Sequence, residues 1–130
     1  MAGTIINIQD LKDEFPDELP MIYNNNGEQE IDEDKLLNAI EDAENHLLSY
    51  LRKVNIDITN PSVKLVRELR RPMLSLTRKY YSNNNGAITE NIISDYDTTI
   101  TWLKDVASGK AFLSSTVSKG SGWKSISMVV

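Results

Sequence analysis

The chain has 130 residues, which suits a single domain, and its 40% hydrophobic and 25% charged content is that of a globular protein. It has no cysteine, which excludes disulfide scaffolds, thiol catalysis and cysteine-ligated zinc. No apolar stretch approaches the roughly 18 residues that cross a bilayer, and no basic segment followed by an apolar one opens the sequence. We therefore expect a protein that works in a cytoplasm, or in an assembly built there, without membrane contact.

The net charge of −5 is unevenly distributed along the chain. The first 46 residues hold 13 acidic side chains against Lys12 and Lys35, whereas residues 47–81 hold 8 basic side chains against Asp57 and Glu68. The sequence leaves two explanations open. An acidic segment can lie against a basic segment of the same chain, or the acidic face of one subunit can meet the basic face of its neighbour.

The first predicted helix is short. Asn7 is a suitable N-cap for residues 8–15, and Pro16 ends the helix. We expect residues 17–23 to form another helical turn, broken around Pro20. An Asn-Asn-Asn-Gly loop follows at residues 24–27, because Asn and Gly tolerate positive φ.

The second predicted helix begins after Asp32, its expected N-cap, and carries acidic residues in its first turn. Apolar residues at helical spacing give it one buried stripe, which Leu37 and Leu48 widen. We expect Ile31 to pack onto the first member of this stripe. The stripe consists of Leu36, Ile40, Ala43, Leu47, Leu51 and Val54.

The third predicted helix opens with Asn60 as its cap and Pro61 at its first position. Pro72 falls inside the helical pattern, where it should kink the helix; a break into two helices at Arg71 is the alternative. The expected buried stripe consists of Leu65, Val66, Leu69, Met73, Leu76 and Tyr80.

The fourth predicted helix has Thr89 as its cap and ends at Gly109. A second Asn-Asn-Asn-Gly loop, at residues 83–86, precedes it, and we interpret both loops as the same way of starting a helix. We expect Ile88 to pack onto this helix from outside. Its expected apolar face consists of Ile92, Ile93, Tyr96, Ile100, Leu103, Val106 and Ala107.

The apolar periodicity ends after residue 110, where serines, glycines and scattered apolar residues begin. This composition predicts a flexible arm over residues 111–130, either disordered or ordered only against a partner. The predicted fold is therefore all-α: a small bundle of three main helices plus a short N-terminal one, over residues 1–110, with an extended or disordered C-terminal tail.

The sequence offers no catalytic residues, no metal ligands and no cofactor site, so we expect neither an enzyme nor a small-molecule substrate. The two Asn-rich loops do not fit a calcium-binding EF-hand, because the acidic first position falls on Ile22 or Tyr81. His46, the single histidine, lies at the edge of an apolar helix face. We expect it to be a partly buried structural residue.

Basic residues align on one face of the third helix: Lys64, Arg67, Arg71 and Arg78, with Arg70 beside them. Such a stripe can follow phosphates, although a pI near 4.8 argues against a free DNA-binding protein. Next to it, Val63, Leu74 and Tyr81 lie away from the main stripe, as Trp102 does on the fourth helix. Arginine and aromatic residues beside aliphatic ones favour a protein interface; the alternative is a wide core that uses both helix faces. The predicted interface residues are Arg67, Arg71, Leu74, Tyr81, Trp102, Trp123, Met128 and Val129.

Four short segments occur in order along the helices: Asp10-Leu11, Asp42-Ala43, Tyr80-Tyr81 and the segment from Trp102 to Lys110. Together they resemble the phage-Mu-like family of small virion morphogenesis proteins, which are similar to head–tail connector adaptors. The resemblance implies a helical subunit that joins others in a ring between portal and tail, through which DNA passes, with no catalytic residues. The implied partners are copies of the chain and neighbouring virion proteins such as portal or tail components. The implied location is the virion, assembled in the host bacterial cytoplasm. A non-viral helical interaction domain and a nucleic-acid-binding helical protein, contacting DNA without sequence specificity, are the alternatives.

Overall fold

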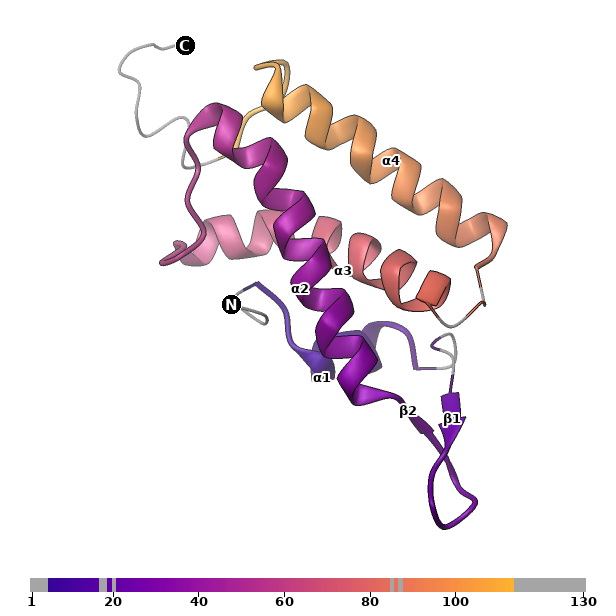
Figure 1. The fold of residues 1–130 in the computed structure, drawn as a ribbon. Helices are drawn as coiled ribbons and strands as arrows, with labels where there is room; N and C mark the ends of the chain where they lie inside the picture. Colours follow the sequence, from indigo (N-terminus) through magenta and orange to yellow (C-terminus); the bar gives the residue numbers. More distant parts are fainter. Residues whose placement is uncertain (1–4, 17–18, 20, 85, 87, 114–130) are drawn as a thin grey trace.

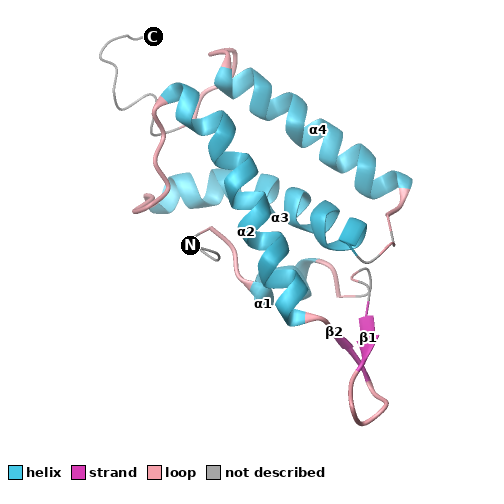
Figure 2. Cartoon of the chain, viewed as in Figure 1, coloured by secondary structure: helices cyan, strands magenta, loops and turns pink. Residues whose placement is uncertain are grey.

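The computed structural model describes residues 5–16, 19, 21–84, 86 and 88–113. It is mostly helical, as predicted, with a small β-hairpin near the N-terminus (Figures 1 and 2). The elements in chain order are α1 (Ile8–Glu14), β1 (Met21–Tyr23), β2 (Gln29–Ile31), α2 (Glu33–Leu51), the 3-10 turn η1 (Arg52–Val54), α3 (Val63–Asn84) and α4 (Glu90–Ala107).

The three long helices α2, α3 and α4 pack against one another and form the body of the protein. The short helix α1 packs against both α2 and α3. Figure 1 shows α1 near the N-terminal half of α2, and the hairpin of β1 and β2 projecting away from the helices. None of the helices in the described part of the chain combines the length and the apolar character that a bilayer crossing requires.

Three of the helix starts follow the predicted capping residues. The Asn7 side chain accepts a hydrogen bond from the Asp10 backbone N–H, and the Asp10 carboxylate accepts one from the Asn7 N–H, both at 2.9 Å. The Asp32 side chain accepts from the N–H of Lys35 at the start of α2. The Thr89 hydroxyl accepts from the N–H of Ile92 at the start of α4. Local side-chain chemistry is therefore sufficient to start these helices.

The predicted start of α3 is wrong by two residues. Ser62, not Asn60, is the cap: its hydroxyl accepts from the Leu65 N–H at 3.1 Å, and its carbonyl accepts from the Val66 N–H at 3.0 Å. Buried Ile56 and Ile58 fix the preceding connector to the core, which delays the helix.

The helix α3 continues through Pro72, so the alternative of two helices separated at Arg71 is wrong. Met73 and Leu76 on one side of the proline, and Leu69 on the other, are fully buried. This packing on both sides offsets the hydrogen bond that the proline removes.

The predicted helical turn over residues 17–23 is also wrong where the structure describes it, because residues 21–23 form a strand. This strand pairs antiparallel with β2, in the register Met21↔Ile31, Ile22↔Glu30 and Tyr23↔Gln29. The hairpin turn is closed by the Asn24 side chain, which accepts hydrogen bonds from the backbone N–H groups of Asn26 and Glu28.

Gly27 in this turn has φ of +79°, a backbone conformation that favours glycine. The first Asn-Asn-Asn-Gly loop therefore joins two strands, whereas the second begins within α3, which includes Asn83 and Asn84. Our interpretation of both loops as helix starts is wrong for the first.

The predicted stripes of the long helices meet in the centre of the body. Leu36, Ile40, Ala43, Leu47 and Leu51 are all fully buried, and so are most of the expected residues of α3. Two predicted core positions, Leu37 and Ile93, are instead 44% and 42% exposed. Both lie beside a buried neighbour at the start of a helix, and none of the described elements covers them.

Segments outside the three long helices also contribute to the core. The apolar residues concerned are Ile5, Ile6, Leu11, Phe15, Leu19, Ile56, Ile58 and Leu113. Ala111 and Leu113 pack against the body although the sequence analysis placed them in the arm. A buried apolar side chain is stabilising wherever it lies in the chain, so the body extends to residue 113.

Candidate interaction surface

Part of the charge segregation is internal to the chain. Arg70 lies 3.6 Å from the Asp10 carboxylate and 3.8 Å from that of Glu14, and Arg71 lies 3.5 Å from Glu14. These pairs place acidic α1 against basic α3. They are largely exposed, so each contributes about 0–1 kcal/mol to stability.

The acidic Asp95 of α4 pairs with two arginines of α3. Its carboxylate lies 3.1 Å from the guanidinium of Arg78 and 3.5 Å from that of Arg71. The Arg78 side chain is only 8% exposed and its guanidinium lies 4.5 Å from the centre of the Phe15 ring. Three of the five residues in the predicted phosphate-binding stripe therefore have acidic partners within the chain. Lys64 and Arg67 are exposed and form no ion pair with any described residue.

Two predicted interface residues belong to the core. Leu74 is 1% exposed and Tyr81 is fully buried, so neither offers its side chain to a partner in this structure. The Tyr81 hydroxyl accepts a hydrogen bond from the Asp32 backbone N–H at 3.2 Å. The prediction is wrong at these positions because α1 and the start of α2 cover the second face of α3. The wide-core alternative is correct there.

The other predicted interface residues divide into three kinds. Arg67 is exposed, and Arg71 is exposed but paired with Glu14 and Asp95. Trp102 is half-buried and packs against the core. Trp123, Met128 and Val129 lie outside the described residues.

The hairpin carries the largest run of exposed apolar residues in the described part of the chain. Met21, Ile22 and Tyr23 are 47%, 37% and 71% exposed. A two-stranded ribbon has no core of its own, and three consecutive exposed apolar residues exceed the scattered exposure normal for a surface.

This surface was not predicted, although the sequence contains a signal for it. An Asn-Gly pair lies between Met-Ile-Tyr and Gln-Glu-Ile, which is the pattern of a hairpin. Glu28 and Glu30 add acidic charge to the hairpin, and neither forms an ion pair with any described residue.

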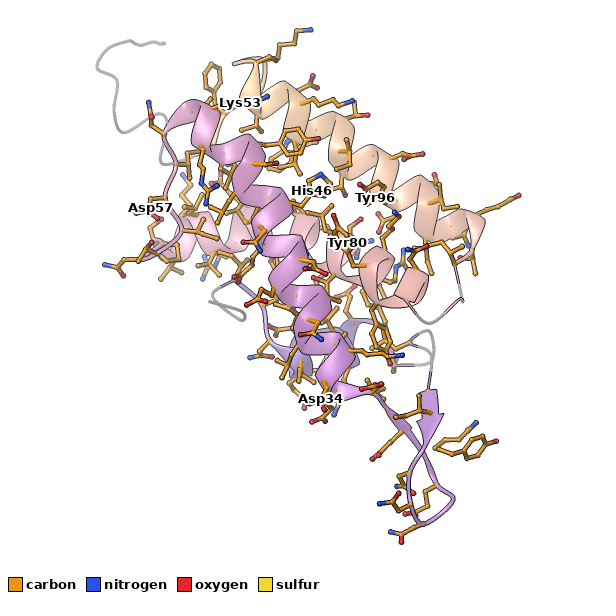
Figure 3. All side chains as sticks on the ribbon, viewed as in Figure 1. Asp34, His46, Lys53, Asp57, Tyr80 and Tyr96 are labelled. Atoms are coloured by element: carbon orange, nitrogen blue, oxygen red, sulfur yellow. The ribbon has the colours of Figure 1, made fainter. Side chains whose placement is uncertain are left out.

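His46 of α2 forms a cluster with Tyr50 of the same helix, Tyr80 of α3 and Tyr96 of α4. Figure 3 shows His46, Tyr80 and Tyr96 between the three long helices. The Nδ1 atom of His46 lies 2.9 Å from the hydroxyl of Tyr80, and its ring lies 5.6 Å from that of Tyr50 and 6.2 Å from that of Tyr96. Burial and the nearby ammonium of Lys79 lower the pKa of His46 from its usual 6.5. Burial raises the pKa of Tyr80 and of Tyr96 above 10.0.

The histidine cluster has the character of a packed polar contact. His46 is half-buried, as the sequence predicted. Its lowered pKa keeps the ring neutral near pH 7, and the raised pKa values of Tyr80 and Tyr96 keep these two hydroxyls protonated there. The Ser49 hydroxyl donates to the backbone carbonyl of His46, and the imidazole ring itself lies within hydrogen-bond distance of Tyr80, so the ring activates no serine among the described residues.

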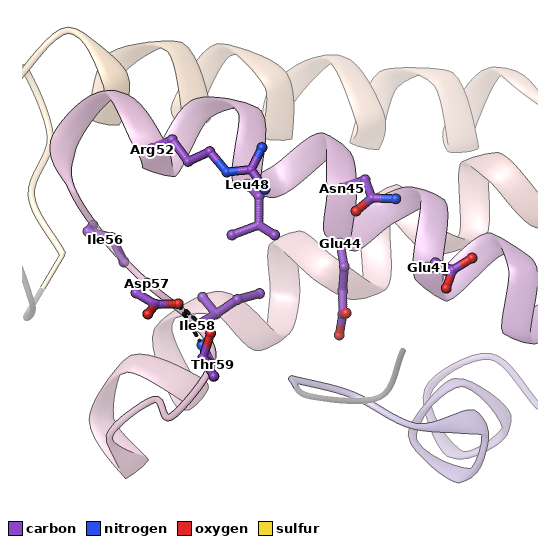
Figure 4. A pocket seen from close by; sticks show the side chains of 9 residues that line it. All are labelled: Glu41, Glu44, Asn45, Leu48, Arg52, Ile56, Asp57, Ile58 and Thr59. Atoms are coloured by element: carbon purple, nitrogen blue, oxygen red, sulfur yellow. Dashed lines mark hydrogen bonds between the residues drawn. The ribbon is translucent and has the colours of Figure 1, made fainter. Parts of the chain in front are cut away.

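Two grooves flank the C-terminal half of α2. The larger, of about 540 Å³, lies between α2 and the connector to α3 (Figure 4). Within it, the Asp57 carboxylate accepts hydrogen bonds from the N–H and the hydroxyl of Thr59, which lower its pKa. This carboxylate closes a turn and has no catalytic partner among the residues that line the groove.

The smaller groove, of about 160 Å³, lies between the C-terminal ends of α2 and α4. We call it the lysine groove; its lining residues are Tyr50, Lys53, Lys104, Ala107 and Ser108. Both lysines are exposed, and neither forms an ion pair with any described residue. Across the described residues, no three histidine, aspartate or glutamate side chains are grouped so as to hold a metal ion.

These features define a small, mostly helical protein with a closed core and a projecting apolar hairpin. Comparison with family models identifies the chain as a member of the family described as bacteriophage Mu, Gp36, which it matches over residues 6–121. The predicted family is therefore confirmed, and it supports a structural or morphogenetic role in a phage. No curated protein and no solved structure matches the chain.

Proposed function

We propose that this protein is a subunit of the head–tail connector of a phage or prophage, and that it acts by protein–protein contact. Its partners are copies of itself and neighbouring virion proteins such as portal or tail components. It resides in the virion, after assembly in the host bacterial cytoplasm. It has no enzymatic activity in this proposal.

The observation that carries the proposal is the projecting hairpin on a protein of a phage family. The body already buries the apolar stripes of its helices, and Met21, Ile22 and Tyr23 are not part of that core. Exposed apolar side chains are costly in water unless a partner covers them, which supports a role in assembly. The family supports the phage setting over a non-viral interaction domain.

Genetic deletion in a phage that encodes the chain tests the proposal. We expect DNA-filled heads and finished tails to accumulate separately, as seen by electron microscopy, and infectivity to return when the gene is supplied from a plasmid. Mass spectrometry of purified wild-type particles should detect the chain. Normal joined particles after deletion would overturn the proposal.

Contact with DNA is a second candidate, and it depends on two exposed basic residues of α3 that have no acidic partner among the described residues. Lys64 and Arg67 would contact phosphates without reading sequence. Retention of the protein on immobilised DNA should then fall steeply with salt and should weaken when both residues are replaced by glutamine. Salt-independent retention, or none, would remove this candidate.

A further inference from the structure

The hairpin and the lysine groove carry opposite charge. Residues 21–31 include two glutamates and no basic residue, and Glu28 and Glu30 are exposed without an ion pair to any described residue. The groove presents Lys53 and Lys104, which are also exposed and form no ion pair with any described residue. Opposite charges that find no partner within a chain can be neutralised between chains.

The two surfaces also correspond in size and polarity. Tyr23 is the most exposed large hydrophobic side chain of the hairpin, at 71%. The lysine groove, at about 160 Å³, accommodates one aromatic side chain but not a helix, and the Tyr50 ring and the Ala107 methyl group provide apolar contact. Tyrosine is favoured at interfaces because it buries a large ring and keeps its hydroxyl at the edge.

The two surfaces lie at opposite ends of the molecule. The hairpin ends at Ile31, two residues before α2 begins, whereas Lys53 lies two residues after α2 ends. A helix of 19 residues is ~28 Å long, so the hairpin of one copy does not reach its own groove. Figure 3 shows Asp34 and Lys53 at the two ends of this helix. Each copy therefore presents one donor end and one acceptor end.

We propose that the hairpin of one copy docks into the lysine groove of a second copy. Tyr23 enters between the C-terminal ends of α2 and α4, and Glu28 and Glu30 face Lys53 and Lys104. This contact is head-to-tail, because two different patches meet and each copy keeps one of each open. Repetition of such a contact closes into a ring when the rotation permits, so the inference deepens the proposed connector function and rests on it.

Engineered cysteines test the contact directly, because the chain has none of its own. Gln29 is exposed and lies opposite Tyr23 in the hairpin, so a cysteine there keeps the docking side chain. Gln29→Cys combined with Ser108→Cys should give a ladder of covalent multimers with a short bismaleimide, whereas each single substitution should give none beyond dimers. The matched control combines Asn45→Cys with Ser108→Cys, since Asn45 is exposed in the middle of α2. Equal ladders from the two pairs, or no ladder from the first, would overturn the inference.

Charge reversal provides an independent test by sedimentation of the full-length protein. The hairpin variant, Glu28→Lys with Glu30→Lys, and the groove variant, Lys53→Glu with Lys104→Glu, should each self-associate at least about tenfold more weakly than the wild type. An equimolar mixture of the two should regain association, because opposite charges then meet at every contact. All four positions are exposed, and unchanged circular dichroism should confirm that the variants fold.

Two outcomes of the sedimentation test would overturn the inference: a wild-type chain that stays monomeric at all concentrations, or variants that associate as the wild type does. Wild-type rings that persist in both variants would refute the hairpin contact and leave the connector proposal standing. Absence of the chain from virions would refute the connector proposal, while the cross-linking ladder would still report the contact.

Discussion

Two apolar regions of this protein differ from what the sequence predicted for them. Leu74 and Tyr81 on α3 lie off the main stripe and beside arginines, as interface residues do, yet both are buried. Met21 to Tyr23 were expected in a helical turn, yet they form an exposed strand. The difference lies in what covers each region. The N-terminal segment and the start of α2 cover α3, whereas nothing described covers the hairpin.

The comparison can be tested first at the buried position. Leu74→Ala should lower the free energy of unfolding by about 2–5 kcal/mol, because it removes a side chain that is 1% exposed and leaves a cavity. Chemical denaturation followed by circular dichroism measures the change. Leu37→Ala, at an exposed leucine of α2, is the matched control and should cost less than about 1 kcal/mol. Equal costs at the two positions would contradict the assignment of Leu74 to the core.

The charged contacts that join α3 to its neighbours should have a smaller effect. Asp95→Ala removes the carboxylate that pairs with Arg78 and Arg71, and should cost about 1–3 kcal/mol because the nearly buried Arg78 loses a partner. Glu14→Ala, which removes an exposed partner of Arg70 and Arg71, should cost at most about 1 kcal/mol. Thermal unfolding of both variants measures whether Asp95→Ala costs more stability than Glu14→Ala. A larger cost for Glu14→Ala would contradict the prediction.

The histidine cluster predicts a modest dependence of stability on pH. Because the folded state holds the pKa of His46 below its usual 6.5, the unfolded chain takes up a proton at a higher pH than the folded chain does. The stabilising contribution of the neutral His46 should therefore be fully present above about pH 6.5. It should be lost as the pH is lowered from there towards the pKa of His46 in the folded state. Denaturation between pH 7.5 and 5.5 measures the slope. His46→Gln should flatten the dependence of the free energy of unfolding on pH, since the chain has no other histidine. An unchanged slope in this variant would mean that other groups cause the pH dependence.

The smallest effect on stability should come from the hairpin. Tyr23→Ala removes a side chain that is 71% exposed, so the free energy of unfolding should change by no more than about 0.5 kcal/mol. Thermal unfolding at low protein concentration provides the measurement, because association would otherwise add apparent stability. A loss of several kcal/mol would mean that the hairpin packs on the body, contrary to the structure.

The sequence alone determined the helices and most of the core. The caps at Asn7, Asp32 and Thr89 and the periodic stripes depend on residues within a few positions of one another, so local chemistry specifies them. The family followed from short motifs along the same helices.

Only the tertiary structure decided which helix faces outside the main apolar stripes are covered. The burial of Leu74 and Tyr81, the pairing of α1 carboxylates with α3 arginines and the groove between α2 and α4 all join residues far apart in the sequence. Helical periodicity shows which residues share a face, but it does not show which other segment lies against that face. The hairpin was missed for a different reason: its turn was readable from Asn-Gly, but its strands are too short to show a period of two.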